Sequence, residues 1–296
     1  MKWYAVLQIM RPANVITSIA DIIAGIAIAG FLIPNMWNPE IITHIILLGV
    51  STACLYAGGI VFNDVFDIEQ DKINRPERVI PSGRLSLKAA QSLGTTLFAL
   101  GIIAAFLVSK TSGFLAMAIM LLALLYDKYS KHHVALGPLN MGLCRGVNLI
   151  LGMSINTALD PKYYLIGLLP VIFISAITLT AQKETKGKNK IAIAIAMLLD
   201  VMIVIGFIAM YQYYDLSIKN AFIFLMFWYG INAFAKLRAI LNNNPKLIQQ
   251  AVKLGVLSLI PLDASYTAGF SSITMALLLL CFLPLSLFLS KKFPVT

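Results

Sequence analysis

The sequence predicts an all-α integral membrane protein, built as a bundle of nine to ten transmembrane helices around a central cavity with a polar cap on the cytoplasmic side. Of the 296 residues, 59% are hydrophobic and only 12% are charged, whereas a soluble domain has about 25% charged residues. The mean hydropathy of +0.84 agrees with this class. No linker divides the chain, so we expect a single transmembrane domain over residues 1–296.

Ten apolar segments are candidates to cross a bilayer, which requires about 20 apolar residues per helix. They cover residues 12–34, 41–63, 87–109, 112–127, 137–157, 163–182, 189–212, 219–239, 247–265 and 270–290. The fourth is short, and the ninth contains Lys253, Pro261 and Asp263. We prefer ten crossings to nine, because omitting the ninth would move Lys291 and Lys292 to the side that carries few positive charges.

Positive charge is distributed unevenly between the two sides of this bundle. With ten crossings, nineteen of the 23 Lys and Arg residues fall on the side that holds both termini, three fall on the other side, and Arg145 lies within a span. The positive-inside rule then places both termini in the cytoplasm, with the bundle in the cell (inner) membrane. The net charge of +10 would face membrane lipid. We expect no nucleic-acid partner, because no soluble basic domain is present.

Carboxylates gather where the second apolar segment ends, in "FNDVFDIEQD". Asp64, Asp67 and Asp71 are spaced by three and four residues, and Asn63 precedes Asp67 by four, so these side chains share one helical face. Acids at this end oppose the helix macrodipole and repel one another, so a solvated helix end gains nothing from them. Mg²⁺ binds through one or two carboxylates plus substrate phosphates. We therefore predict a Mg²⁺ site here, and expect that removing Asp67 or Asp71 does not lower stability when Mg²⁺ is absent.

Four stretches of the chain follow motifs that occur together in one family. "NDVFDIEQD" fits the signature N-D-x-x-D-x-x-x-D, and "RPERVIPSGRLS" is similar to R-P-x-R-x-x-P-S-G. "RPANVITSIAD" is similar to a first helix that begins R-P-x-N, and "YDKYSKHHVALGPLNMG" to a Y-x(4)-K segment after the fourth span. From Arg11 to about residue 190, the chain resembles the UbiA superfamily of intramembrane prenyltransferases.

This resemblance implies a helical bundle that uses Mg²⁺ and a prenyl diphosphate donor. It assigns catalytic and metal-binding roles to Asp64, Asp67, Asp71 and Glu184, with Asn63 as a further metal ligand. It also assigns substrate binding to residues of the matched segments, namely Lys72, Arg75, Arg78, Tyr126 and Lys131. Lys183 and Lys188, in the segment after the sixth span, are further candidates for binding the diphosphate.

The segment after the sixth span departs from the family pattern. The family usually carries a second motif, D-x-x-x-D, where this chain reads "QKETKGKNK". Glu184 can stand for one acid, but Lys188 occupies the place of the other. Either the lysines bind diphosphate by direct ion pairing, or the protein has lost turnover. A tenth span is a second departure, since the family typically has nine. "CRGVN" and "LIPLDA" resemble a divergent bacterial branch, so no acceptor is carried over.

Polar side chains also occur inside the predicted spans, where ionisable residues usually face the interior and mark function. In the first span Asn14 and Asp21 share a face, and in the fifth Arg145 and Asn148 share one. We interpret Arg145 as a diphosphate ligand and Asp21 as an acceptor ligand or base, or the two as a structural ion pair. Asn14 and Asn148 would bind substrate or join helices by hydrogen bonds.

Two further acids, Asp200 and Asp263, stand isolated in their spans and are structural or acceptor-facing. The function favoured by the whole pattern is Mg²⁺-dependent transfer of an isoprenyl group, within the membrane, from a prenyl diphosphate to a small, unidentified acceptor. One alternative is a catalytically silent isoprenoid-binding membrane protein. The other is an ion- or proton-coupled transporter, which the lack of an inverted repeat disfavours.

Overall fold

The computed structural model describes residues 2–33, 37–182, 187, 189–214, 216 and 218–293. This part of the chain consists of helices and connecting loops, and it contains no strand. The helices are α1 (Lys2–Met10), α2 (Pro12–Ile28), α3 (Pro39–Phe66), α4 (Ile68–Asn74), α5 (Leu87–Val108), α6 (Lys110–Lys128), α7 (Leu136–Met153), α8 (Leu168–Ala181), α9 (Lys190–Tyr213), α10 (Ile218–Leu241), α11 (Pro245–Leu257), α12 (Leu259–Phe270), α13 (Ile273–Leu280) and α14 (Phe282–Lys292), with short 3₁₀ turns η2 (Ser130–His132) and η3 (Pro161–Gly167).

The predicted helical membrane bundle is confirmed. Within the described ranges, eight helical units are long and apolar enough to cross a membrane, and the bent pair α1–α2 makes a ninth. The tenth predicted segment is α7, and its two ends lie at opposite ends of the helical bundle. Val134, just before α7, accepts a hydrogen bond of 2.8 Å from Gln182 at the end of α8. At the other end of α7, Asn156 donates a hydrogen bond of 3.2 Å to the carbonyl of Ala29, which directly follows α2.

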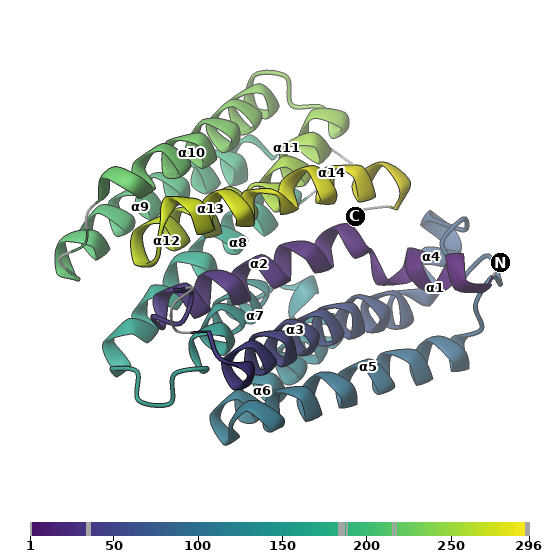
Figure 1. Cartoon of the computed structure of the whole chain (residues 1–296). Coiled ribbons are helices and arrows are strands. Elements are labelled where there is room, and N and C mark those ends of the chain that lie inside the picture. The colour runs from purple at the N-terminus through teal and green to yellow at the C-terminus, as the bar shows by residue number, and fades with distance from the viewer. Residues whose placement is uncertain are drawn as a thin grey trace.

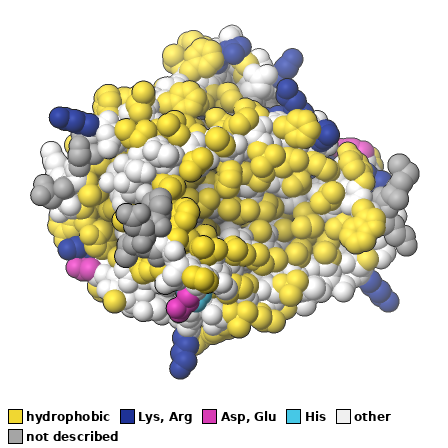
Figure 2. All heavy atoms as spheres, viewed as in Figure 1, with side chains coloured by type: hydrophobic (Ala, Val, Ile, Leu, Met, Phe, Trp, Pro, Cys, Tyr) yellow, Lys and Arg dark blue, Asp and Glu magenta, His cyan; other side chains and the backbone are white. Residues whose placement is uncertain are grey.

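The outer surface carries the side chains expected to contact lipid. In Figure 2 hydrophobic side chains cover most of the visible face, and Lys and Arg lie mainly around its rim. Large apolar side chains on the outer helices are more than half exposed, including Ile103 of α5, Leu198 of α9, Ile223 of α10 and Leu278 of α13. These residues need no polar partner in a bilayer, so their exposure fits a protein that crosses the membrane several times.

Helix α2 is the central element of the bundle. It packs against α3, α7, α12 and α14 (Figure 1). Helices α5, α9 and α10 lie further out, with α5 packed along α3 and α9 between α8 and α10. The Tyr4 hydroxyl in α1 donates a hydrogen bond of 3.3 Å to the Lys292 carbonyl, so α1 and the end of α14 lie on the same side of the bundle.

Several helices begin at residues whose side chains cap them. An N-cap side chain accepts a hydrogen bond from a backbone N–H of the first turn, which otherwise has no partner in the helix. The caps are Asn38 for α3, Ser86 for α5, Ser109 for α6, Asn244 for α11 and Ser272 for α13. These polar residues fix where each apolar segment starts.

Helices α2 and α7 approach each other closely through two glycines. A Cβ atom on Gly25 would lie 2.3 Å from the Leu149 carbonyl oxygen and 2.8 Å from the Gly152 Cα. A Cβ on Gly152 would lie 2.5 Å from the Ile22 carbonyl oxygen. Only glycine fits at such a contact, and small residues commonly allow membrane helices to pack this closely. The contact brings the polar faces of α2 and α7 together.

The chain bends by 51° between α1 and α2, at Arg11. Arg11 has φ 46° and ψ 67°, in the left-handed region, and it precedes Pro12. A following proline disfavours the right-handed helical conformation, so α1 cannot run straight into α2. The bend directs the Arg11 side chain towards α3.

Candidate functional site

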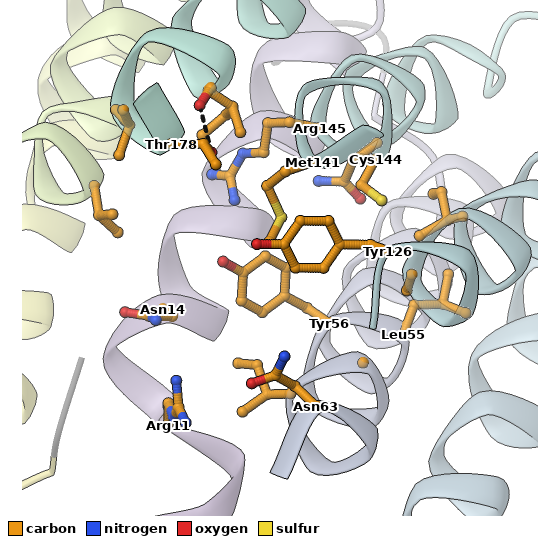
Figure 3. A pocket seen from close by; sticks show the side chains of 18 of the residues that line it. Arg11, Asn14, Leu55, Tyr56, Asn63, Tyr126, Met141, Cys144, Arg145 and Thr178 are labelled. Atoms are coloured by element: carbon orange, nitrogen blue, oxygen red, sulfur yellow. Dashed lines mark hydrogen bonds between the residues drawn. The ribbon is translucent and has the colours of Figure 1, made fainter. Parts of the chain in front are cut away.

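A cavity of about 330 Å³ lies between six helices. Its walls come from the start of α2 and from α3, α6, α7, α8 and α11, and most lining side chains are apolar. Polar residues gather at two places. We call the part formed by Arg11, Asn63 and Asp127, next to α4, the α4 end. We call the part formed by Arg145 and Asn148 the inner end. Figure 3 shows Tyr56 and Tyr126 pointing into the space between them.

The three acids of the predicted Mg²⁺ motif form ion pairs with basic side chains near the α4 end. Asp64 lies 2.7 Å from Arg11 and 3.3 Å from Arg78. Arg78 also lies 2.7 Å from Asp71. Asp64 and Asp71 are buried. Asp64 and Asp71 therefore meet at one guanidinium although they lie on two helices, α3 and α4, and cations of the neighbouring segments reduce the repulsion between the acids.

Two contacts join the acid motif to the segment between α6 and α7. Asn63 donates a hydrogen bond of 2.8 Å to Asp127, and Lys131 forms an ion pair with Asp67. Asn63 and Asp67 are four residues apart, and so are Asp127 and Lys131. The two contacts therefore lie about one helical turn apart. The Y-x(4)-K segment is thereby held beside the acid motif.

A buried polar network forms the inner end. Arg145 Nε lies 2.5 Å from Asp21 Oδ2, and Asn148 donates to the same oxygen at 2.9 Å. Thr52 of α3 donates to Asn148 at 2.7 Å. Asp263 of α12 is buried near Asp21. Of the interpretations open at Asp21 and Arg145, an ion pair between them is present, and Arg145 still lines the cavity while Asp21 lies behind it.

The two acids expected to stand isolated lie near other charged residues. Asp263 is buried near Asp21, as described above. Asp200 of α9 forms a fully buried ion pair with Lys236 of α10, at 2.6 Å, and both side chains are 1% exposed. Lys236 was counted among the cytoplasmic charges, but it lies inside the bundle. The pair between Asp200 and Lys236 agrees with a structural role for Asp200, and it was not foreseen because partners on different helices cannot be identified from spacing along one helix.

The predicted site residues other than Asp21, which lies behind Arg145, divide into four groups. Those that line the cavity are Asn14, Asn63, Tyr126, Arg145 and Asn148. Those that lie near its α4 end in ion pairs are Asp64, Asp67, Asp71, Arg78 and Lys131. Lys72 forms an exposed pair with Glu69, and Arg75 ends α4 half-buried, so neither lines the cavity. Lys183, Glu184 and Lys188 lie outside the described residues.

Arg11, Asp127 and Tyr56 line the cavity but were not singled out as site residues from the sequence. Arg11 was noted only as part of the first motif, Asp127 only within the Y-x(4)-K segment, and Tyr56 not at all. Asp127 is 4% exposed, and the Tyr56 ring lies 5.7 Å from the Arg145 guanidinium. The sequence offered one signal for Asp127. It precedes Lys131 by four residues, as Asn63 precedes Asp67.

Comparison with known proteins identifies the family. The model of the UbiA prenyltransferase family matches residues 22–198, more than half of the chain. The chain belongs to the UbiA prenyltransferase family. The UbiA relative from Sulfurisphaera tokodaii, a digeranylgeranylglyceryl phosphate synthase, is 30% identical over 182 residues, 62% of this chain and 63% of the relative. The chain spans about 54–63% of the lengths of this and two other curated relatives of that name. These relatives do not confirm the predicted bacterial branch.

Solved UbiA structures share the fold over almost the whole chain. An apo UbiA homolog from Aeropyrum pernix superposes with a TM-score of 0.68 at 19% identity, covering 85% of this chain and 96% of the homolog. A UbiA homolog from Archaeoglobus fulgidus, bound to GPP and Mg²⁺, superposes with a TM-score of 0.62 at 13% identity, covering 89% and 99%. The UbiA fold therefore extends well beyond the segment matched by the family model, in a multi-pass membrane protein.

Proposed function

We propose that this protein transfers an isoprenyl group from a prenyl diphosphate to a small acceptor within the membrane, in a Mg²⁺-dependent reaction. The observation that carries the proposal is a largely apolar cavity inside the bundle that ends beside a cluster of acids and cations. Membership of the UbiA prenyltransferase family and the name of the curated relatives support it. The GPP and Mg²⁺ bound to the Archaeoglobus fulgidus homolog support the choice of donor and metal.

The α4 end would bind the diphosphate. Arg11, Arg78 and Lys131 supply three cations there, each paired with an acid of the motif. A diphosphate could take over some of these cations, since charge-assisted hydrogen bonds to phosphate are among the strong ones. Lys72 and Arg75 remain proposed donor ligands by their place in the matched segments, and Lys183 and Lys188 remain so by their place in the lysine-rich segment after the sixth span.

The acid motif beside the α4 end fits Mg²⁺. Asp64, Asp67 and Asp71 offer carboxylate oxygens on successive turns, Asn63 adds an amide oxygen, and Glu184 remains a proposed further ligand. Among the described residues, no three acids, histidines or cysteines converge closely enough to hold a metal ion by themselves. Mg²⁺ does not need such a cage, because it binds through one or two carboxylates plus substrate phosphates. When bound, it would help neutralise the charge that develops on diphosphate as the allylic C–O bond breaks.

The rest of the cavity would hold the prenyl chain and keep water away from the reacting carbon. Leu55, Ile119, Ile174 and Val252 come from four different helices and form apolar walls. Exclusion of water matters because water would capture the allylic cation and release a free prenol. Tyr56 and Tyr126 lie between the two ends, where aromatic rings would stabilise the cation by about 0.5–2 kcal/mol each.

The acceptor would approach from the inner part of the cavity. In the balanced reaction, the prenyl carbon forms a bond to an acceptor oxygen, the carbon–diphosphate bond breaks, diphosphate leaves, and the acceptor loses one proton. Asn14, Arg145 and Asn148 would position the acceptor, with Asp21 orienting two of them. A glyceryl phosphate is the acceptor class that the name of the curated relatives supports.

We further propose that residues 1–296 act as one prenyltransferase-like domain in the cell (inner) membrane, with both termini in the cytoplasm. The contact between Tyr4 and Lys292 supports placing the two ends on one side. The distribution of Lys and Arg supports the cytoplasm as that side. The burial of Lys236 removes one positive charge from the cytoplasmic count, and that side still carries most of the positive charges.

The test uses the purified full chain in detergent. It is incubated with Mg²⁺, with dimethylallyl, geranyl or geranylgeranyl diphosphate, and with glyceryl phosphate lipids or a total lipid extract. The expected result is Mg²⁺-dependent release of diphosphate together with a new, more apolar lipid. Binding of the donor without release would support a silent isoprenoid-binding protein. Neither binding nor release would contradict the proposal.

A further inference from the structure

One carboxylate faces the cavity in the part of the chain that the structure describes, and it is Asp127. The three acids of the N-D-x-x-D-x-x-x-D motif do not line the cavity. Asp127 ends the last full turn of α6 and is 4% exposed. A ligand inside the cavity would therefore contact the carboxylate of Asp127 rather than those of the three motif acids.

Asp127 also differs from the motif acids in its partners. Asp64, Asp67 and Asp71 each form an ion pair with Arg11, Arg78 or Lys131. Within the described ranges, no basic side chain lies within ion-pair distance of Asp127, and its hydrogen bond comes from the neutral amide of Asn63. A buried charge without a counter-ion is strongly destabilising. Among the four acids in this region, Asp127 is therefore the one whose carboxylate has no direct ion pair in the described ranges.

The hydrogen bond to Asp127 also fixes the orientation of Asn63. Only the Nδ2 group of an amide can donate to a carboxylate, so this bond identifies the Oδ1 atom of Asn63 as the atom left to act as a metal ligand. Asp127 and Asn63 together offer a carboxylate and an amide oxygen, which are the hard ligands that Mg²⁺ prefers.

The sequence leaves a place for such a ligand. The segment from Lys183 to Lys190 holds one acid, Glu184, and four lysines, so it cannot supply two carboxylates. We propose that Asp127 supplies an oxygen ligand to the Mg²⁺ of the donor complex and so replaces the acid missing from that segment. This inference rests on the proposed function, and it extends the metal site across the cavity from α3 to α6.

The test measures metal binding directly. Mn²⁺, used in place of Mg²⁺, is titrated into the full chain in detergent with inorganic diphosphate present, and free Mn²⁺ is followed by electron paramagnetic resonance. Asp127→Asn removes the charge but keeps an oxygen that accepts from Asn63. We expect it to weaken Mn²⁺ binding at least ~10-fold, the lower range for loss of even an outer-shell partner. Asp127→Glu keeps a carboxylate and should bind Mn²⁺ more tightly than Asp127→Asn.

The controls separate this inference from the proposed function. Asp160→Asn removes an exposed acid remote from the cavity and should leave Mn²⁺ affinity unchanged. Unchanged Mn²⁺ affinity in Asp127→Asn, or a change confined to the KM for acceptor, would overturn the role of Asp127 while leaving the metal site intact. Equal affinities of the Asn and Glu variants would also overturn it. If the parent itself binds no Mn²⁺ with diphosphate, the proposed metal dependence fails, and the inference fails with it.

Discussion

Arg78 Nη1 lies 2.7 Å from Asp71 Oδ2, so the segment after α4 folds back and pairs with the last acid of the motif. The same guanidinium lies 3.3 Å from Asp64, near the end of α3. The acids of this motif are therefore held by cations before any metal binds. This changes the stability that the sequence alone predicted for their variants.

The first prediction concerns Asp67. Asp67→Ala should abolish prenyl transfer, and in the absence of Mg²⁺ it should lower the free energy of unfolding by about 1.5–3 kcal/mol, because Lys131 loses a charged hydrogen-bond partner. Thermal unfolding in detergent and diphosphate release measure the two effects. The matched control is Glu69→Ala, in the same segment, whose pair with Lys72 is exposed and should contribute below about 1 kcal/mol. Unchanged or raised stability of Asp67→Ala would show that repulsion between the acids dominates, as the sequence alone predicts.

A second prediction compares two buried ion pairs. Arg145→Leu and Lys236→Leu each leave one acid buried without its cation, and each should lower the free energy of unfolding by about 3–5 kcal/mol. Replacing both members of either pair with leucine should recover most of that loss. The double variant at Asp200 and Lys236 should keep its turnover, because neither residue lines the cavity. The double variant at Asp21 and Arg145 should not, and normal turnover in it would remove Arg145 from the site.

The third prediction tests the contact between α2 and α7. Gly152→Ala would place a Cβ 2.5 Å from the Ile22 carbonyl oxygen, so the helices must separate, and overpacking of this kind typically costs about 1–3 kcal/mol. Gly49→Ala is the matched control, because nothing lies within 4 Å of the place that its Cβ would occupy on α3, and alanine favours the helix by about 0.5–1 kcal/mol. Melting temperatures should move in opposite directions. A stable Gly152→Ala protein would show that the helices separate without cost.

The fourth prediction concerns orientation in the membrane. In a chain whose Cys54, Cys144 and Cys281 are replaced, a cysteine at position 160 should react with an impermeant reagent added to intact cells. A cysteine at position 75 should react only after the cells are permeabilised, as the positive-inside rule requires. Labelling of position 75 from outside would reverse the proposed orientation.

Much of the bundle could be predicted from the sequence, because apolar length is a property of each segment by itself. Even the ninth segment was found despite Lys253 and Asp263, since the charge balance across the membrane required it. The acid motif was likewise visible, because its spacing of three and four residues follows helical periodicity. Periodicity did not show that the chain divides into α3 and α4 at Asp67.

Contacts between helices could not be predicted in this way. Periodicity does not tell which other helix a face meets, so the pairs Asp200–Lys236 and Asn63–Asp127 were missed. The close packing through Gly25 and Gly152 sets the distance between Asp21 and Arg145, and neither glycine carries a side chain that would reveal it. The cavity depends on these contacts, so its lining was only partly foreseen.

The backbone of Arg11 has a consequence for how this position could change during evolution. A non-glycine residue in the left-handed region is less stable there by roughly 1–2 kcal/mol, and glycine would adopt the same angles freely. Glycine would, however, remove the guanidinium that contacts Asp64. Removing one member of a buried ion pair typically costs about 3–5 kcal/mol, which is more than the strain that glycine would relieve, so selection for heat resistance and selection for catalysis would both favour arginine. A laboratory library screened for thermal survival alone should therefore retain arginine at this position, in spite of its backbone angles.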